Sequence, residues 1–188
     1  HLARRWRDPE PAPLAGAAAS LHRQGCPVLD LVTANPHEHG ISFPASELRA
    51  IMLEAAERIA VYQPDAMGHG RAREAVAAWY ARRGAPADPA RILLTPGTSQ
   101  AYFYALRLLA DAGDEILVPS PGYPLFDDLA AIAGVRLRRY HLRRERGQWS
   151  IDPDEVDFQC TPRTRALMVV SPHNPTGLMP GAGDWEAL

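Results

Sequence analysis

The chain has 188 residues, of which 46% are apolar and 22% charged, and its formal net charge is −2. This balance is typical of a globular protein with a buried core, and it gives no reason to expect nucleic acid or an anionic membrane as a partner. The sequence has no apolar run of about 18 residues and no secretory signal at its start, so we expect a cytoplasmic protein that binds small molecules.

The spacing of apolar residues predicts the elements in chain order. A helix up to about Gly25 is followed by a strand over 28–32 and a loop over 35–44. Ser46 is predicted to cap an amphipathic helix, and a second helix runs over 71–83 and stops at Gly84.

From there strands and helices alternate along the chain. The predicted elements are a strand at 92–94, a helix at 99–112, a strand at 115–118, a helix at 125–133 and strands at 135–142 and 166–170. This alternation predicts an α/β fold with a largely parallel sheet. The arginine-rich stretch 136–146 is interpreted as a solvated strand edge and turn.

Three polar segments follow predicted strands. Residues 95–101 join a strand to a helix and carry Thr98 and Ser99, which suits an anion at a helix N-terminus or, alternatively, a simple helix cap. Tyr123 lies in a proline-rich loop and either stacks on a flat ligand or packs within the protein. Asn174 lies between prolines after the last strand. Loops at one sheet edge can converge on a single ligand.

The segment Pro172–Gly177, Pro-His-Asn-Pro-Thr-Gly, is similar to the PxNPTG signature of the class I/II aminotransferases. Pro119–Pro124 resembles the P-x-P-x-Y-P loop that precedes this signature in the family. Tyr62 and Gly68 with residues 72–75 resemble its Y…G…LREA segment, and residues 97–101 resemble its phosphate loop. The resemblance runs from about Leu29 to Gly177, with the motifs in the family's order.

The resemblance implies a pyridoxal-phosphate (PLP) dependent aminotransferase of fold-type I, with a three-layer αβα large domain and a mostly parallel sheet, incomplete here. Residues 1–45 would contribute to the small domain and the substrate loop, and residues 46–188 to the PLP-binding large domain. The substrates implied are an amino acid and a 2-oxo acid, and the complete enzyme is expected to be a homodimer.

The resemblance also implies a role for particular residues. Thr98 and Ser99 would hold the PLP phosphate, Tyr123 would stack on the pyridine ring, and Asn174 would hydrogen-bond the phenolic oxygen. Tyr62 would reach the phosphate in the partner subunit, or else pack beside a helix. Ala34 stands in the substrate loop where many relatives have glycine, which puts the shape of the substrate pocket in doubt. Ala72 replaces the usual leucine.

The sequence contains no lysine, because all 20 residues of its Lys+Arg count are arginine. We therefore expect no catalytic residue in this chain and place the family's cofactor lysine beyond Leu188, in a sequence cut at both ends. The alternatives are a lysine-free pseudoenzyme, a carbon–sulfur lyase or synthase on the same scaffold, and the aminotransferase-like domain of a transcription regulator. The residues His37, Glu38 and His39 are not expected to bind a metal, because two ligands in one loop make a poor first shell.

Overall fold

The computed structural model describes residues 13–30 and 33–188. The chain divides into two units, one up to Tyr62 and the other from Gln63. A division of the complete enzyme's domains between residues 45 and 46 stays a prediction. Within residues 13–30 and 33–188, no helix combines the length and the apolar character that a bilayer crossing requires.

The first unit contains two helices and a short 3-10 turn. Helix α1 spans Pro13–Arg23 and confirms the first predicted helix, and η1 spans Pro36–His39. Helix α2 spans Ala45–Ile59, but the prediction of a Ser46 cap was wrong: the N-cap is Pro44, and no side chain caps the helix. Because α2 begins one residue before Ser46, that hydroxyl lies inside the first turn.

The predicted strand at 28–32 does not form where the chain is described. Residues 28–30 have no regular structure, and residues 31–32 lie outside the described residues. An extended segment becomes a strand only when a second strand pairs with its backbone groups. Instead, the Thr33 N–H donates to Asp30 Oδ1 at 3.0 Å and closes a local turn.

The second unit begins with helix α3, Gly70–Ala81, which confirms the predicted helix at 71–83, and with the 3-10 turn η2, Pro89–Arg91. The predicted strand at 92–94 was wrong, because Ile92–Leu94 do not pair with a strand among the described residues. One bond takes its place: the Leu94 N–H donates to Met67 O at 2.9 Å. Ile92 has the extended backbone of a strand, with φ of −102° and ψ of 123°, but the sequence of this segment does not specify a partner strand.

Three parallel strands form the sheet, in the order β2–β1–β5, with β1 spanning Glu115–Ser120, β2 Arg136–His141 and β5 Thr164–Leu167. Strands β1 and β2 pair in register from Glu115↔Arg136 to Ser120↔His141. The parallel sheet predicted from the alternation of strands and helices is therefore confirmed.

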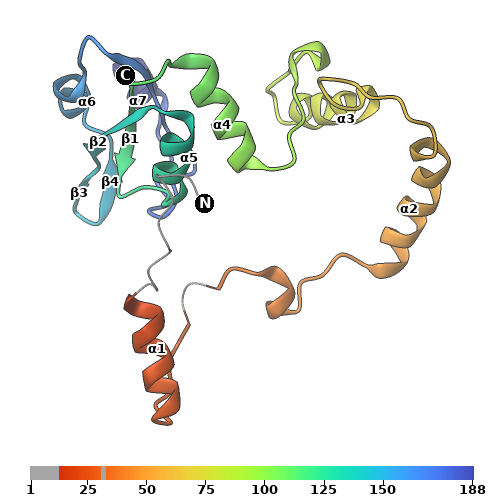
Figure 1. Cartoon of the computed structure of the whole chain (residues 1–188), viewed down its shortest axis with the longest axis horizontal. Coiled ribbons are helices and arrows are strands. Elements are labelled where there is room, and N and C mark those ends of the chain that lie inside the picture. Colours follow the sequence, from red (N-terminus) through yellow and green to blue (C-terminus); the bar gives the residue numbers. More distant parts are fainter. Residues whose placement is uncertain (1–12, 31–32) are drawn as a thin grey trace, which may run out of the picture. The chain divides into compact units, whose positions relative to one another are not determined.

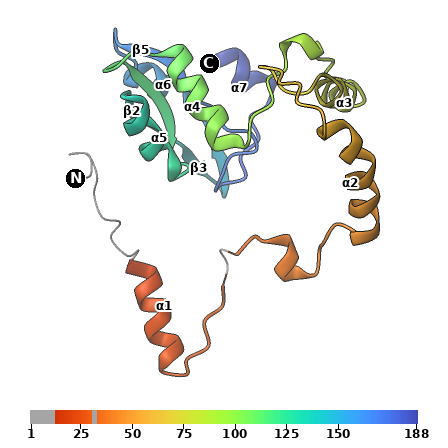
Figure 2. The same ribbon diagram turned by 45° about the vertical axis from the view of Figure 1, so that its right-hand side comes forward.

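Helices cover both faces of this sheet. Helices α4 (Thr98–Leu109) and α5 (Leu125–Ala133) lie together against one face (Figures 1 and 2). Ile116 and Val118 of β1 pack with them, whereas Leu117 points to the other face and packs with Val156 of α6 (Pro153–Gln159). Because alternate strand residues face opposite sides, both cores are built from the same strand. The three-layer αβα prediction is confirmed.

The arginine-rich stretch forms β2 and part of an antiparallel hairpin, as the predicted strand edge and turn required. The hairpin joins β3, Arg143–Glu145, to β4, Gln148–Ser150, and turns at residues 146–147, which have φ of 49° and 85°. The last helix, α7, spans Ala182–Ala187.

Candidate functional site

Two of the three polar segments leave the sheet at one edge. The loop after β1 carries Tyr123, and the segment after β5 carries Asn174. Strands β1 and β5 are neighbouring and parallel, with Leu117 opposite Leu167, so their carboxyl ends point the same way. Ligands of open α/β sheets bind at this edge.

Helix α4 brings the third segment to the same edge. Near its start, Tyr102 meets Phe126 of α5 edge-on at 5.1 Å between ring centroids. Near its end, Arg107 Nη1 donates to Ala133 O at 3.1 Å. The two helices therefore run in the same direction, and the start of α4 lies beside the start of α5, which follows the carboxyl end of β1.

The start of α4 offers a set of hydrogen-bond donors. Its N-cap is Gly97, and no side chain caps the helix, so the alternative that Thr98 or Ser99 serves as the cap is not what the structure shows. The first bond within the helix runs from the Ala101 N–H to Gly97 O at 3.2 Å. The N–H groups of Thr98, Ser99 and Gln100 have no acceptor among the described residues, as is normal for a first helical turn, and they suit an anion.

Space and donors at this turn fit a phosphate. A Cβ placed on Gly97 would meet nothing within 4 Å, so the space beside the N-cap of the helix is open. The side chain of Thr98 is exposed and that of Ser99 half-buried. Backbone donors, two hydroxyls and the positive end of the helix dipole together form the donor set that a phosphate group requires.

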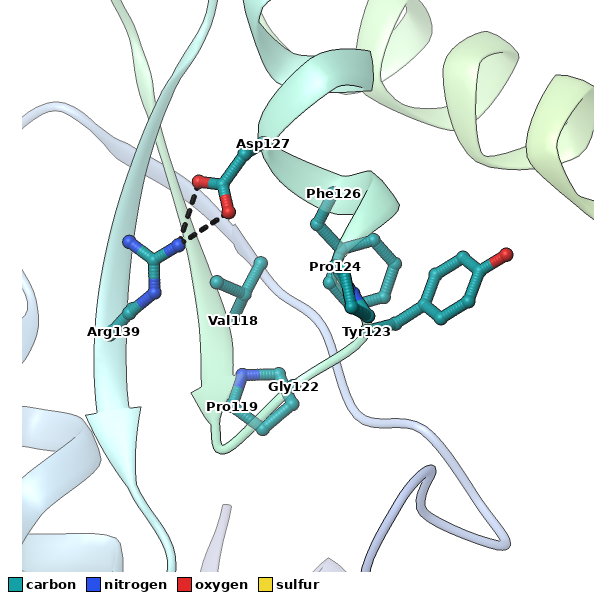
Figure 3. A pocket seen from close by; sticks show the side chains of 8 residues that line it. All are labelled: Val118, Pro119, Gly122, Tyr123, Pro124, Phe126, Asp127 and Arg139. Carbon is teal, nitrogen blue, oxygen red and sulfur yellow. Dashed lines mark hydrogen bonds and ion pairs between the residues drawn. The ribbon is translucent and has the colours of Figure 1, made fainter. Parts of the chain in front are cut away.

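Tyr123 lies half-buried in the loop after β1 and packs edge-on to Phe126 at 5.5 Å between ring centroids. Figure 3 shows its ring directed away from the ion pair of Asp127 with Arg139, in which Arg139 Nη2 lies 2.7 Å from Asp127 Oδ1. A pocket of about 70 Å³ behind the loop is smaller than ligand sites of roughly 300 Å³ or more, so it does not hold a cofactor by itself.

The segment after β5 is closed on itself by its own hydrogen bonds. The His173 N–H donates to Leu178 O at 2.8 Å, and the Gly177 N–H donates to His173 O at 2.7 Å. His173 Nδ1 is hydrogen-bonded to Thr176 Oγ1 at 2.8 Å. These bonds leave the Asn174 side chain exposed at the tip of the segment. The peptide bonds preceding Pro121, Pro172 and Pro175 are cis.

His173 itself is buried, with 4% of its surface exposed. Its Nε2 has no hydrogen-bond partner in the part of the chain that the structure describes. Burial lowers the pKa of the imidazole below its ordinary value, because the charged form loses its hydration. Sequence reasoning named this position only as part of a motif, and no local pattern distinguishes a buried histidine from an exposed one.

Tyr62 and Ala34 belong to the first unit. The side chain of Tyr62 is 90% exposed at the end of that unit, and Ala34 is exposed in the loop before η1. The roles predicted for both residues stay predictions.

Arg73 is a residue that sequence reasoning treated only as part of a motif. Its guanidinium contacts the turn at 65–68 and the 3-10 turn η2, and its side chain is 17% exposed. The signal available in the sequence was an arginine in the first turn of a helix whose less exposed face otherwise carries Gly70, Val76 and Ala77.

Residues 26–188 match the family model described as "Aminotransferase class I and II". The chain is 31% identical to the glutamate-pyruvate aminotransferase AlaA of Escherichia coli K12 over 168 residues, which cover 88% of this chain and 40% of that protein. It is 36% identical to human tyrosine aminotransferase over 116 residues, which cover 62% of this chain and 25% of that protein.

Solved structures give the same result. A mutant of the aspartate aminotransferase of Thermus thermophilus superposes with a TM-score of 0.81 at 28% identity, covering 100% of this chain and 49% of that one. An alanine aminotransferase from Pyrococcus furiosus superposes with a TM-score of 0.77 at 28% identity, covering 92% of this chain and 44% of that one. The chain thus spans less than half the length of these relatives.

Proposed function

We propose that this chain, which belongs to the class I and II aminotransferase family, forms the cofactor-holding part of an enzyme that transfers an amino group between an amino acid and a 2-oxo acid. Members of this family depend on PLP, which supplies an electron sink for bonds at the amino acid's α-carbon. The observation that carries the proposal is the presence of three polar segments at one sheet edge, each after a strand or at a helix start.

The phosphate of PLP would bind at the start of α4. Three N–H groups and the hydroxyls of Thr98 and Ser99 are available there, and none is used to cap the helix. The aligned peptide dipoles of the helix add positive potential at its N-terminus, so this turn favours an anion. The residues present therefore fit the group that the family requires.

The ring of PLP would lie between the other two segments. Tyr123 would stack on it, since Phe126 already supports the tyrosine ring from its edge. The amide of Asn174 would donate a hydrogen bond to the phenolic oxygen and stabilise its anionic form. The role of these residues is to hold the ring and to tune its charge.

The complete enzyme would be a homodimer in the cytoplasm. Tyr62 would contribute its hydroxyl to the phosphate site of the partner subunit, a role that its 90% exposure supports, because an exposed tyrosine has a free hydroxyl. Ala34 would line the substrate side of the site.

Borohydride reduction of the whole protein with PLP, followed by peptide mass spectrometry, tests the proposal. None of the 188 residues is a lysine, so any adduct must map to a lysine outside them. We expect one labelled lysine, together with a 2-oxo acid product from an amino-acid donor. A folded protein without an adduct would overturn the proposal, and an adduct with loss of sulfide in place of amino transfer would identify a carbon–sulfur lyase.

The variant Asn174→Ala tests the role of the amide. Removing a donor to the phenolic oxygen should raise the pH at which the absorption band of the bound cofactor changes, by about one pH unit, since one charge-assisted hydrogen bond contributes about 1.5 kcal/mol or more. The control Gln148→Ala removes an exposed amide from the β3–β4 hairpin and should leave the band unchanged. An unshifted band in Asn174→Ala would contradict this role.

A further inference from the structure

Arg73 lies in the first turn of α3 and forms hydrogen bonds through all three nitrogen atoms of its guanidinium. Its Nε donates to Gly68 O at 2.9 Å, its Nη1 to Pro89 O at 2.9 Å, and its Nη2 to Asp65 Oδ2 at 3.0 Å. The planar guanidinium presents its N–H groups in fixed directions from three nitrogen atoms, whereas the three donors of a lysine share one nitrogen at the end of a flexible stem. One side chain thus joins the helix to two separate backbone segments.

The turn at 65–68, which Arg73 contacts, also contacts Leu94. The Asp65 carboxylate accepts the Met67 N–H at 2.8 Å through its other oxygen, and Met67 O accepts the Leu94 N–H at 2.9 Å. Gly68 packs so closely on Leu94 that a Cβ there would lie 2.6 Å from the Cβ of Leu94. The backbone of Leu94 is therefore fixed by the turn.

Leu94 lies directly before the loop that leads into α4. Residues 95–97 connect it to Thr98, and Thr95 Oγ1 donates to Gly97 O at 3.1 Å within this loop. Only three residues thus separate the anchored Leu94 from the first free N–H group of the helix. A displacement of Leu94 would therefore also displace the N–H groups at the start of α4, because the connection between them is only three residues long.

We propose that Arg73 is a positioning residue for the cofactor phosphate, acting through the turn at 65–68 and Leu94 on the loop at 95–99. This inference rests on the proposed function, since it requires PLP phosphate at the start of α4. The pKa of Asp65 lies below its ordinary value, because the Met67 N–H and the Arg73 guanidinium stabilise the carboxylate.

The test compares the affinities of PLP and pyridoxal, which lacks the phosphate, in the whole protein freed of its cofactor. Arg73→Gln should lower the preference for PLP over pyridoxal about tenfold, roughly the effect of one charge-assisted hydrogen bond on the phosphate. The matched control is Arg71→Gln, an exposed arginine in the same helical turn with no hydrogen bond or ion pair in the described chain. It should leave the preference unchanged.

A second variant, Asp65→Asn, removes one of the three anchors and should lower the preference in the same direction by a smaller factor. It decides the matter if Arg73→Gln fails to fold, which circular dichroism and thermal melting of each variant would show. A preference unchanged in the folded variants, or affinities for both compounds reduced equally, would overturn the inference and leave the proposed function standing. A wild-type protein that binds neither compound, or binds both equally, would refute the proposed function and the inference with it.

Discussion

The substitution Gly68→Ala should destabilise the protein more than any ordinary surface change. Gly68 has φ of +89°, and an added Cβ would lie 2.6 Å from the Cβ of Leu94 and 2.9 Å from its Cγ and Cδ1. The left-handed backbone costs an alanine about 1–2 kcal/mol, and forcing a methyl group into a filled space costs about 1–3 kcal/mol. Together we expect a loss of about 2–5 kcal/mol in the free energy of unfolding.

Gly84→Ala is the matched control, because it shares the backbone conformation without the close contact. Its φ is +77°, and a Cβ there would meet nothing within 4 Å. It should therefore cost only the backbone part, about 1–2 kcal/mol. Urea unfolding of the whole protein, followed by circular dichroism, gives both free energies by linear extrapolation.

The difference between the two variants is the decisive quantity. In a Leu94→Ala background the contacts to Cγ and Cδ1 disappear but the contact between the two Cβ atoms stays, so Gly68→Ala should still cost more than Gly84→Ala. Equal losses in the two variants would refute the close approach of the 65–68 turn to Leu94, and with it a step of the argument for Arg73.

Two further predictions concern buried polar side chains. Tyr140→Phe removes the hydroxyl that donates to Met168 O at 3.0 Å and should cost about 1–3 kcal/mol in urea unfolding, because the half-buried carbonyl loses this donor. Burial also raises the pKa of Tyr140 to about 12, so one tyrosine should ionise at higher pH than the others when absorbance is followed in alkali. Tyr140→Phe should remove this last ionisation. The pKa of His173 is lower in the folded protein than in the unfolded chain, so on acidification the unfolded chain takes up a proton at this histidine before the folded protein does. The free energy of unfolding should therefore be highest above pH 6.5 and fall as the pH drops towards the folded-state pKa. His173→Gln should reduce the pH dependence of the unfolding midpoint over that range. An unchanged slope of the midpoint against pH would show that His173 is not the group responsible.

Some elements could be predicted from the sequence almost to the residue. Helix α5 was predicted at 125–133 and spans Leu125–Ala133, because proline precedes it and Gly134 follows it in the left-handed conformation that ends helices. Strand β2 was likewise found within one residue at each end. Residues next to each element indicate where it begins and ends, so its position could be predicted without knowledge of tertiary contacts.

Other elements depended on contacts that the local sequence does not specify. Ile92–Leu94 has the apolar character of a strand, yet its position is set by Met67 and Gly68, which lie far back in the chain. Helix α6 was not predicted although Asp152 caps it and Pro153 begins it, because it spans one short stretch with Val156 as its buried residue. A helix with so little buried surface gives almost no periodic signal.

The candidate site shows the same division. The prediction that loops after successive strands share one edge follows from the parallel sheet, and it needs only the order of strands and loops. The direction of α4 could not be predicted, because it depends on Tyr102 meeting Phe126 and Arg107 meeting Ala133 across helices. The anchoring by Arg73 could not be predicted either, since three acceptors from two segments meet only in the folded chain.

The three polar segments share one arrangement, which explains why their polar groups remain free to bind a ligand. In each segment an apolar neighbour is packed into a core while the polar group is left exposed or uncapped: Tyr102 and Phe126 belong to the core on the α4 and α5 face, and Leu178 packs on the other. Asn174 stays exposed because the bonds of His173 satisfy the backbone around it. Backbone N–H groups that the helix holds in place and leaves without an acceptor lose little conformational entropy when a ligand binds. Loosening the anchors should therefore weaken ligand binding even where every contacting group is retained.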